Sequence, residues 1–312
     1  MPHVTFIHGI ANKPPQDNLL RIWENSLASG GGIDLNDAGV TTSMVYWADC
    51  MYDAPMAEAA FESAANLAGP DVAVSPQDAI DQSWRQELPL DEKIMVEKLA
   101  AKLKFEMMVD DTIIAAEEAI GIEYERIPLP GWLKKRLMAT FLRDVHHYLY
   151  NVQFSPRPGA TYQLQDEIRR RLVTALQEGA SKPGPHVLIS HSMGTVMAYD
   201  CLKRVPDCPT VDAFMTIGSP LGLDEVQDPL KPELTRDDGF PSARVKGRWI
   251  NVYDSLDPVA GLDPKLANDY RRGGEQVVED VNEKNWGKWR HDITKYLAGQ
   301  QLRSKLQELL QL

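Results

Sequence analysis

Two kinds of segment alternate along most of the chain. Short apolar runs rich in β-branched residues predict buried strands at Val4–Ile7, Thr41–Trp47, His186–Ile189, Val211–Ile217, Arg248–Tyr253 and, interrupted by acidic residues, Gln276–Val281. Longer stretches with apolar residues every three or four positions predict helices at Asn18–Ala28, Thr161–Gln177, Gly194–Arg204 and His291–Leu310. Because such alternation builds βαβ units, we expect an α/β fold with a mostly parallel central sheet of about six strands flanked by helices.

The region 50–155 breaks the alternation, because its patterns are helical only. They span Pro55–Leu67, Asp91–Ile120 and Trp132–Val152, and proline-rich hinges lie at 128–131 and 156–159. The last pattern carries an apolar stripe that we interpret as packed core, formed by Leu133, Leu137, Phe141, Val145, Leu149 and Val152. We therefore interpret residues 1–312 as one α/β domain with a helical insertion at 50–155. The insertion would be a cap over the carboxyl edge of the sheet, with a dimer interface as the alternative.

Composition and charge narrow the classes of function. The chain is 43% hydrophobic and 25% charged, as is ordinary for globular proteins, and its net charge of −12 disfavours nucleic acid as a partner. No stretch approaches 18 apolar residues, so no transmembrane segment is expected. The three cysteines form no disulfide or metal pattern, and the first residues lack the features of a signal peptide. A cytoplasmic location is the resulting expectation.

A serine stands where an apolar strand runs directly into a helix. Residues 187–194 read Val-Leu-Ile-Ser-His-Ser-Met-Gly. At such a turn Ser192 would be held in a strained conformation with its Oγ above the sheet edge and helix N–H groups behind it. Strand and helix pass closely there, so small residues are needed on both sides; Gly194 fits, and Ser190 stands where glycine is usual. The alternative is that Ser192 only caps the following helix.

A His-Gly turn ends the first predicted strand. Gly9 would let the backbone approach a substrate, and the N–H of Ile10 would then point at a carbonyl oxygen. The second donor for such an oxygen would be the N–H of the residue after the nucleophile, Met193. We therefore expect Ile10 and Met193 to form an oxyanion hole.

His8-Gly9, the Ser-His-Ser-Met-Gly turn, Asp257-Pro258-Val259 and the late His291 together resemble the α/β-hydrolase superfamily, especially its lipase- and esterase-like members. The resemblance covers residues 1–50 and about 155–312 and skips the insertion. It implies a Ser-Asp-His triad in chain order and hydrolysis of an ester or related acyl bond. Because the sequence opens on the His-Gly strand, we expect the antiparallel strand pair that often precedes this strand in that superfamily to be missing.

The general base should be a histidine on a loop at the carboxyl end of the last strand. His291 meets this requirement just before the final helical pattern. His3 and His186 lie at strand starts, at the opposite edge of the sheet. His8 is expected to pack or hydrogen-bond in its turn, and His191 to point away from the serine.

The acid of the triad should follow the next-to-last strand, where Asp254, Asp257 and Asp263 occur. We assign Asp257, since Pro258 fixes the backbone after it and the resemblance places the acid in this turn. Its carboxylate would hold the imidazole in the tautomer that accepts the serine proton. Asp254 follows the strand at once and is expected to cap local N–H groups.

These residues predict a serine hydrolase that cleaves a carboxylic ester, from a small-molecule or lipid-like substrate, through an acyl-enzyme. No cofactor is expected. No metal is expected either, because no Cys or carboxylate cluster accompanies His146 and His147 at the spacing of metal ligands. Other acyl chemistry on the same fold, as in a thioesterase, amidase or lyase, is one alternative. A non-catalytic binding protein on this scaffold is the other.

Overall fold

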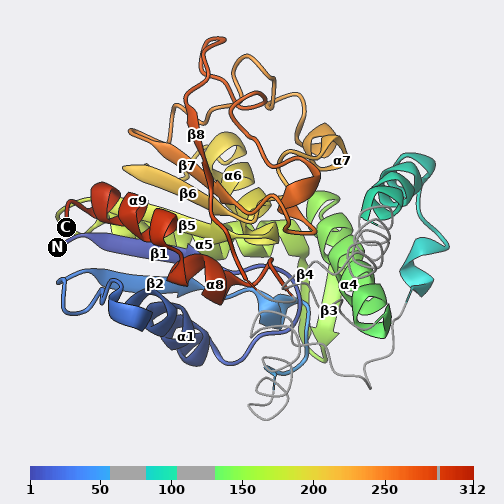
Figure 1. Cartoon of the computed structure of the whole chain (residues 1–312). Coiled ribbons are helices and arrows are strands. Elements are labelled where there is room, and N and C mark those ends of the chain that lie inside the picture. Colours follow the sequence, from blue (N-terminus) through green and yellow to red (C-terminus); the bar gives the residue numbers. More distant parts are fainter. Residues whose placement is uncertain (57–81, 104–130, 287–288) are drawn as a thin grey trace, which may run out of the picture.

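The computed structural model describes residues 1–56, 82–103, 131–286 and 289–312 (Figure 1). A six-stranded, all-parallel sheet in the order β2-β1-β5-β6-β7-β8 forms its centre. The strands are β1 (His3–Ile7), β2 (Thr41–Val45), β5 (His186–His191), β6 (Ala213–Ile217), β7 (Trp249–Tyr253) and β8 (Val278–Asn282). Every predicted strand is present, and the predicted fold class is confirmed.

Helices cover both faces of the sheet (Figure 1). On one face lie α1 (Gln16–Ala28), α8 (Ile293–Ala298) and α9 (Gln300–Leu310), and on the other α5 (Leu164–Ala180), α6 (Met193–Arg204) and α4 (Gly131–Leu149), with the short α7 (Asp224–Gln227) beyond the end of β6. Each group shares one hydrophobic cluster with alternate residues of the strands, because successive side chains of a strand point to opposite faces. The continuous apolar runs of the sequence follow from burial on both faces.

Strand order brings two chain segments together at one edge. β1 pairs with β5 along its whole length, from His3 opposite His186 to Ile7 opposite Ser190. The turns that follow these two strands, at Gly9 and at Ser192, therefore emerge side by side at the carboxyl edge of the sheet, where open α/β sheets bind ligands.

Two predicted helices differ from those observed. The helix predicted at Thr161–Gln177 begins at Leu164, because β3 (Gln153–Arg157) and β4 (Ala160–Gln163) pair as an antiparallel hairpin. The proline-rich segment 156–159 is the end and turn of this hairpin, with Gly159 at φ 79°. The predicted helix His291–Leu310 is divided at Gly299, where a side chain would collide with the carboxylate of Glu283.

Two of the three helices predicted in the region 50–155 are helical in their described parts, whereas residues 55–56, at the start of the third, are not. Residues 90–103 are helical, and α4 buries the predicted stripe residues Leu137, Phe141, Val145 and Leu149 as core. Most of the patterns predicted at Pro55–Leu67 and Asp91–Ile120 lies outside the described residues. The cap and the domain boundaries stay predictions.

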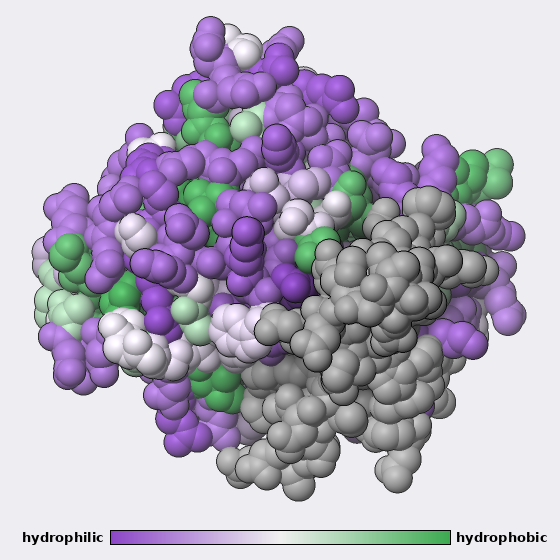
Figure 2. Space-filling view, in the orientation of Figure 1, coloured by the Kyte–Doolittle hydropathy of each residue, from purple (hydrophilic) through white to green (hydrophobic). Residues whose placement is uncertain are grey.

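Figure 2 shows one face of the molecule, which is largely hydrophilic with scattered apolar residues outside the grey part. Within the described ranges, no helix is both long enough and apolar enough to cross a membrane.

A buried carboxylate joins α4, α5 and α6. Asp200 on α6 is fully buried and accepts hydrogen bonds from Arg169 Nε at 2.6 Å and Nη2 at 2.8 Å, and from the Tyr148 hydroxyl at 2.7 Å. Arg204 adds a contact at 3.1 Å, one turn along α6. Because Arg169 comes from α5 and Tyr148 from α4, this single carboxylate fixes α4 against the body of the domain.

We expect Asp200→Ala to lower the free energy of unfolding by about 3 kcal/mol, since it leaves Arg169 and the buried Tyr148 hydroxyl without their acceptor. Alanine favours helix, so the loss would not come from helix propensity. Urea denaturation measures it. Asp228→Ala is the control, because its pair with Lys231 is largely exposed and worth at most about 1 kcal/mol. Equal losses in the two variants would contradict the assigned role.

Candidate active site

Ser192 is held in a backbone conformation that few non-glycine residues adopt. Its φ is 53° and its ψ −128°, at the junction between β5 and α6. A Cβ on Gly194 would lie 2.6 Å from the carbonyl oxygen of His8, so only glycine lets α6 start this close to β1. Ser190 is accommodated because its hydroxyl donates to the carbonyl of Met215 at 3.1 Å. The hydroxyl of Ser192 makes no capping hydrogen bond to α6. This observation disfavours the alternative that Ser192 serves only as a helix cap.

Ser192, His291 and Asp257 lie in one hydrogen-bonded line. The Oγ of Ser192 is 2.8 Å from His291 Nε2, and His291 Nδ1 is 2.9 Å and 2.8 Å from Oδ1 and Oδ2 of Asp257. All three are buried, with 1%, 4% and 2% of their surfaces exposed, respectively. With Nδ1–H donating to the carboxylate, Nε2 is the acceptor that faces the serine hydroxyl. The structure thus brings together the three residues assigned to the triad.

The Asp257 carboxylate is surrounded by donors. Besides His291, Oδ1 accepts the N–H groups of Val259 at 2.8 Å and Ala260 at 3.1 Å, and Oδ2 accepts the Tyr296 hydroxyl at 2.7 Å. Burial alone would raise the pKa of Asp257, but His291 and these donors outweigh it and leave the pKa below its usual value. The carboxylate is therefore ionised at neutral pH and holds the proton of His291 on Nδ1.

Asp254 has a different role from Asp257. Its Oδ1 accepts the N–H of Leu256 at 2.8 Å, as the expected local cap does. Its Oδ2 also accepts the N–H of Asn285 at 2.8 Å and an Nη1–H of Arg290 at 3.1 Å. Asp254 therefore anchors the segment that delivers His291 without touching the imidazole. Asp263 lies beside Gly222.

The other histidines near β1 and β5 have structural partners. Nε2 of His8 accepts the N–H of Trp47 at 3.0 Å, and the His8 ring stacks on that indole, as expected for a neutral packed ring. His3 and His186 contact Thr41 and Thr5 at the opposite end of the sheet. His191 lies closer to the site than expected: its ring is 4.8 Å from that of His291, and its Nε2–H donates to the His291 carbonyl at 3.0 Å.

The histidine pair of α4, His146 and His147, has hydrogen-bond partners within the helical region. His146 and His147 share a hydrogen bond between their Nδ1 atoms at 3.0 Å, and His146 Nε2 contacts Glu92 at 2.6 Å. Burial is the main cause of the low pKa of His147, about 3, so this ring stays neutral. Among the described residues, no group of three or more potential ligands is placed to hold a metal ion.

The turn after β1 lies directly against the serine. A Cβ on Gly9 would be 2.6 Å from the Cβ of Ser192, so glycine is required there. Within the described part of the chain, no hydrogen-bond acceptor meets the backbone N–H of Ile10 or of Met193. The turn itself is fixed from α4, since the N–H of Ala11 donates to Asp144 Oδ2 at 3.2 Å. Ile10 and Met193 thus keep two N–H groups available beside Ser192.

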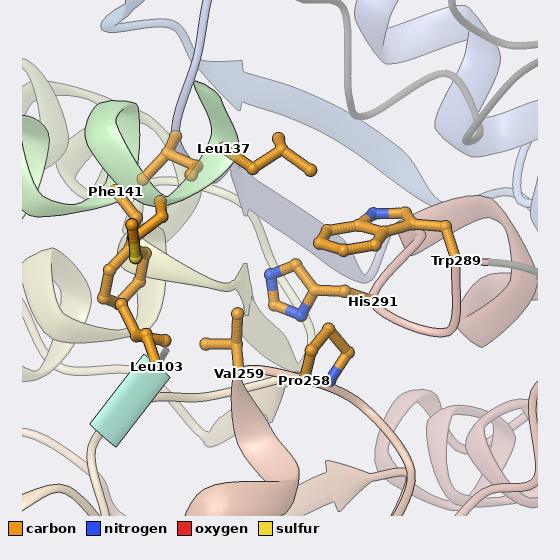
Figure 3. A pocket seen from close by; sticks show the side chains of 9 residues that line it. Leu103, Leu137, Phe141, Pro258, Val259, Trp289 and His291 are labelled. Atoms are coloured by element: carbon orange, nitrogen blue, oxygen red, sulfur yellow. The ribbon is translucent and has the colours of Figure 1, made fainter. Parts of the chain in front are cut away.

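Two adjoining cavities open at His291. One is small and apolar, with a cavity volume of about 30 Å³, and Figure 3 shows its side chains around the imidazole. It is lined by Ile10, Leu103, Leu137, Met138, Phe141, Pro258, Val259, Trp289 and His291. The second includes Ser192 and is lined by Gly9, Ile10, Lys13, Leu137, His191, Trp289 and His291. Leu137 of α4 therefore lines both cavities, together with Ile10, Trp289 and His291.

Two residues of the site were not predicted from the sequence. Gly218, after β6, has φ 56°, and a Cβ there would lie 3.2 Å from both Asp257 Oδ2 and the His291 ring. The sequence could have indicated a turn at Gly218, because this glycine follows an apolar strand and precedes a Ser-Pro pair. Tyr296 had no distinguishing signal, because it falls in a helical pattern that predicts core packing.

We expect Gly218→Ala to destabilise the fold more than Gly273→Ala. Both glycines have the same backbone strain, with φ 56° and 57°, but Gly273 has nothing within 4 Å of its added Cβ. The shared backbone cost is about 1–2 kcal/mol, and Gly218→Ala adds crowding against Asp257 and His291. Urea denaturation of both variants measures the difference. Equal losses would mean that the carboxylate and imidazole are not packed against Gly218.

No protein-family model matches this chain, and a search of curated proteins also finds no match. The chemistry of the chain is therefore inferred from the geometry of its own side chains.

Proposed function

We propose that this protein is a serine hydrolase of the α/β-hydrolase type that cleaves carboxylic esters. The observation that carries the proposal is the buried line from Ser192 Oγ through His291 to Asp257, with contacts of 2.8, 2.8 and 2.9 Å. The six-stranded parallel sheet and the strained turn at Ser192 support the same assignment. Thioesters and amides remain alternative acyl substrates, because the same residues can attack them.

The geometry supports acyl transfer in two steps. Ser192 Oγ attacks the ester carbonyl while its proton passes to His291 Nε2, and the resulting imidazolium is stabilised by the ionised Asp257. The N–H groups of Ile10 and Met193 would receive the oxyanion. His291 then returns the proton to the leaving alcohol, and water, activated by the same Nε2, releases the acid and restores Ser192. Ser192, His291 and Asp257 perform these steps without a metal or an organic cofactor.

The apolar cavity supports a preference for substrates whose acyl group is apolar. Among the described residues, its walls are aliphatic and aromatic side chains, including those of α4 and of the turn after Asp257, together with the imidazole of His291. Burying each methylene of an acyl chain there contributes about 0.8 kcal/mol. We therefore propose a small-molecule or lipid-like acyl ester as the substrate, with α4 as part of a cap that would move to admit the acyl chain and select its length.

A fluorophosphonate should label Ser192, and Ser192→Ala should abolish both labelling and ester hydrolysis. Labelling that persists in Ser192→Ala would refute the assigned nucleophile.

We expect Asp257→Asn to fold but to lose about 10⁴ in kcat, because the amide favours the wrong imidazole tautomer. Asp254→Asn is the control; it leaves the contact between Asp257 and His291 in place and should lose no more than about tenfold in kcat. Mass spectrometry of the labelled peptide and p-nitrophenyl ester kinetics provide the measurements.

Substitution Met138→Trp should shift the preference toward shorter acyl chains. Met138 lines the apolar cavity, and a larger side chain would occupy the space of the distal methylenes. We expect the ratio of kcat/KM for p-nitrophenyl octanoate to that for the acetate to fall by about tenfold or more. Lys135→Trp, at an exposed position of the same helix, is the matched control. An unchanged ratio in Met138→Trp would show that this cavity does not receive the acyl chain.

A further inference from the structure

One buried hydroxyl joins the two acidic residues that follow β7. Tyr296 on α8 is fully buried. Its hydroxyl accepts the backbone N–H of Asp254 at 2.8 Å and donates to Asp257 Oδ2 at 2.7 Å. Because an O–H group has one proton, the contact with the Asp254 N–H leaves that proton directed at the carboxylate.

The same carboxylate oxygen receives two donors from one short segment. Asp257 Oδ2 accepts His291 Nδ1–H at 2.8 Å and the Tyr296 hydroxyl at 2.7 Å. Asp292 lies between them and caps α8 by accepting the N–H of Thr294 at 2.9 Å. The cap fixes the first turn of α8, so the two donors have a defined spacing. The carboxylate plane is thereby fixed relative to the imidazole.

Tyr296 remains a donor across the working range of pH. Burial, followed by the charge of Asp257, raises its pKa well above the usual value, so the phenol stays protonated. Tyr296 contributes to neither of the two cavities at His291. Any effect of its hydroxyl on catalysis would therefore pass through Asp257 and not through contact with substrate.

We propose that Tyr296 is a positioning residue, whose hydroxyl orients the Asp257 carboxylate and moderates the basicity of His291. This inference rests on the proposed function of the Ser192 site. A hydroxyl proton directed at the carboxylate offsets part of its negative charge, so the carboxylate stabilises the imidazolium less strongly. Loss of the hydroxyl should make His291 easier to protonate and its ring less firmly held.

Other charged and titratable groups surround His291 and must be separated from this effect. They are His191 at the end of β5, Arg290 and Asp292 beside it in the chain, Asp254 behind Tyr296, and Lys13 at the cavity of Ser192. Tyr296→Phe removes one hydroxyl and leaves each of these side chains in place.

The test compares Tyr296→Phe with Tyr270→Phe in the full chain. Tyr270 is equally buried, and its hydroxyl donates to the carbonyl of Leu221 at 2.7 Å, so the control loses a comparable hydrogen bond away from the triad. For each variant we would measure p-nitrophenyl ester kinetics across pH. In parallel, NMR would follow the imidazole titration of the resting protein, with His291 assigned through His291→Gln.

In Tyr296→Phe we expect kcat to fall about tenfold with KM nearly unchanged, since a hydrogen bond to an ionised group is lost outside the substrate cavities. The acid limb of the kcat profile and the His291 titration should both move to higher pH, by about half a unit to one unit. Tyr270→Phe should leave the profile and the titration unchanged.

An unmoved His291 titration in Tyr296→Phe would overturn the proposal, as would equal losses in both tyrosine variants. Failure of the proposed function is a separate result: wild-type protein would then show neither hydrolysis nor fluorophosphonate labelling. The NMR titration still tests the link from Tyr296 to His291 in that case, because it needs no turnover.

Discussion

The close passage of α6 over the end of β1 is the contact on which the rest of the site depends. Gly194 faces the carbonyl oxygens of Ile7 and His8, where a Cβ would lie at 2.8 Å and 2.6 Å. This approach forces the chain to reverse sharply at Ser192, whose N–H is held by the Ile217 carbonyl at 2.9 Å. The strain at Ser192 is thus maintained by packing on both sides, and it keeps the hydroxyl directed at His291.

The fold and most of the site were predictable because both follow from where strands end. Ser192 and Asp257 follow the buried strands β5 and β7, and His291 follows the edge strand β8. Parallel strands place the segments that follow them at one edge of the sheet. Tyr296 was not predictable, since an apolar helical pattern does not reveal a hydroxyl directed at a carboxylate. The β3–β4 hairpin was not predicted, because the prolines at 156 and 158 were interpreted as a hinge. Pro156 is nevertheless tolerated there, since both strands of a two-stranded ribbon are edge strands.

The two buried carboxylates Asp200 and Asp257 are stabilised by different kinds of partner. At α4–α6, Asp200 is matched by Arg169 and Arg204 and by the Tyr148 hydroxyl, and it joins the three helices. At the site, Asp257 is matched by a histidine and by neutral donors from the backbone and Tyr296. Neutral donors keep the carboxylate ionised without adding a fixed positive charge, so the imidazole remains the group that can take up a proton.

Asp254 and Asp257 could not exchange these roles. Asp257 presents Oδ2 to His291 and Tyr296, whereas both oxygens of Asp254 are occupied by Leu256, Asn285 and Arg290. The Asp254 backbone N–H, by contrast, holds the Tyr296 hydroxyl in place for Asp257. One acidic residue therefore fixes the segments that carry the donors, and the other receives them. That division leaves the imidazole with Asp257 as its carboxylate partner among the described residues, which suits the proposed role of His291 as a general base.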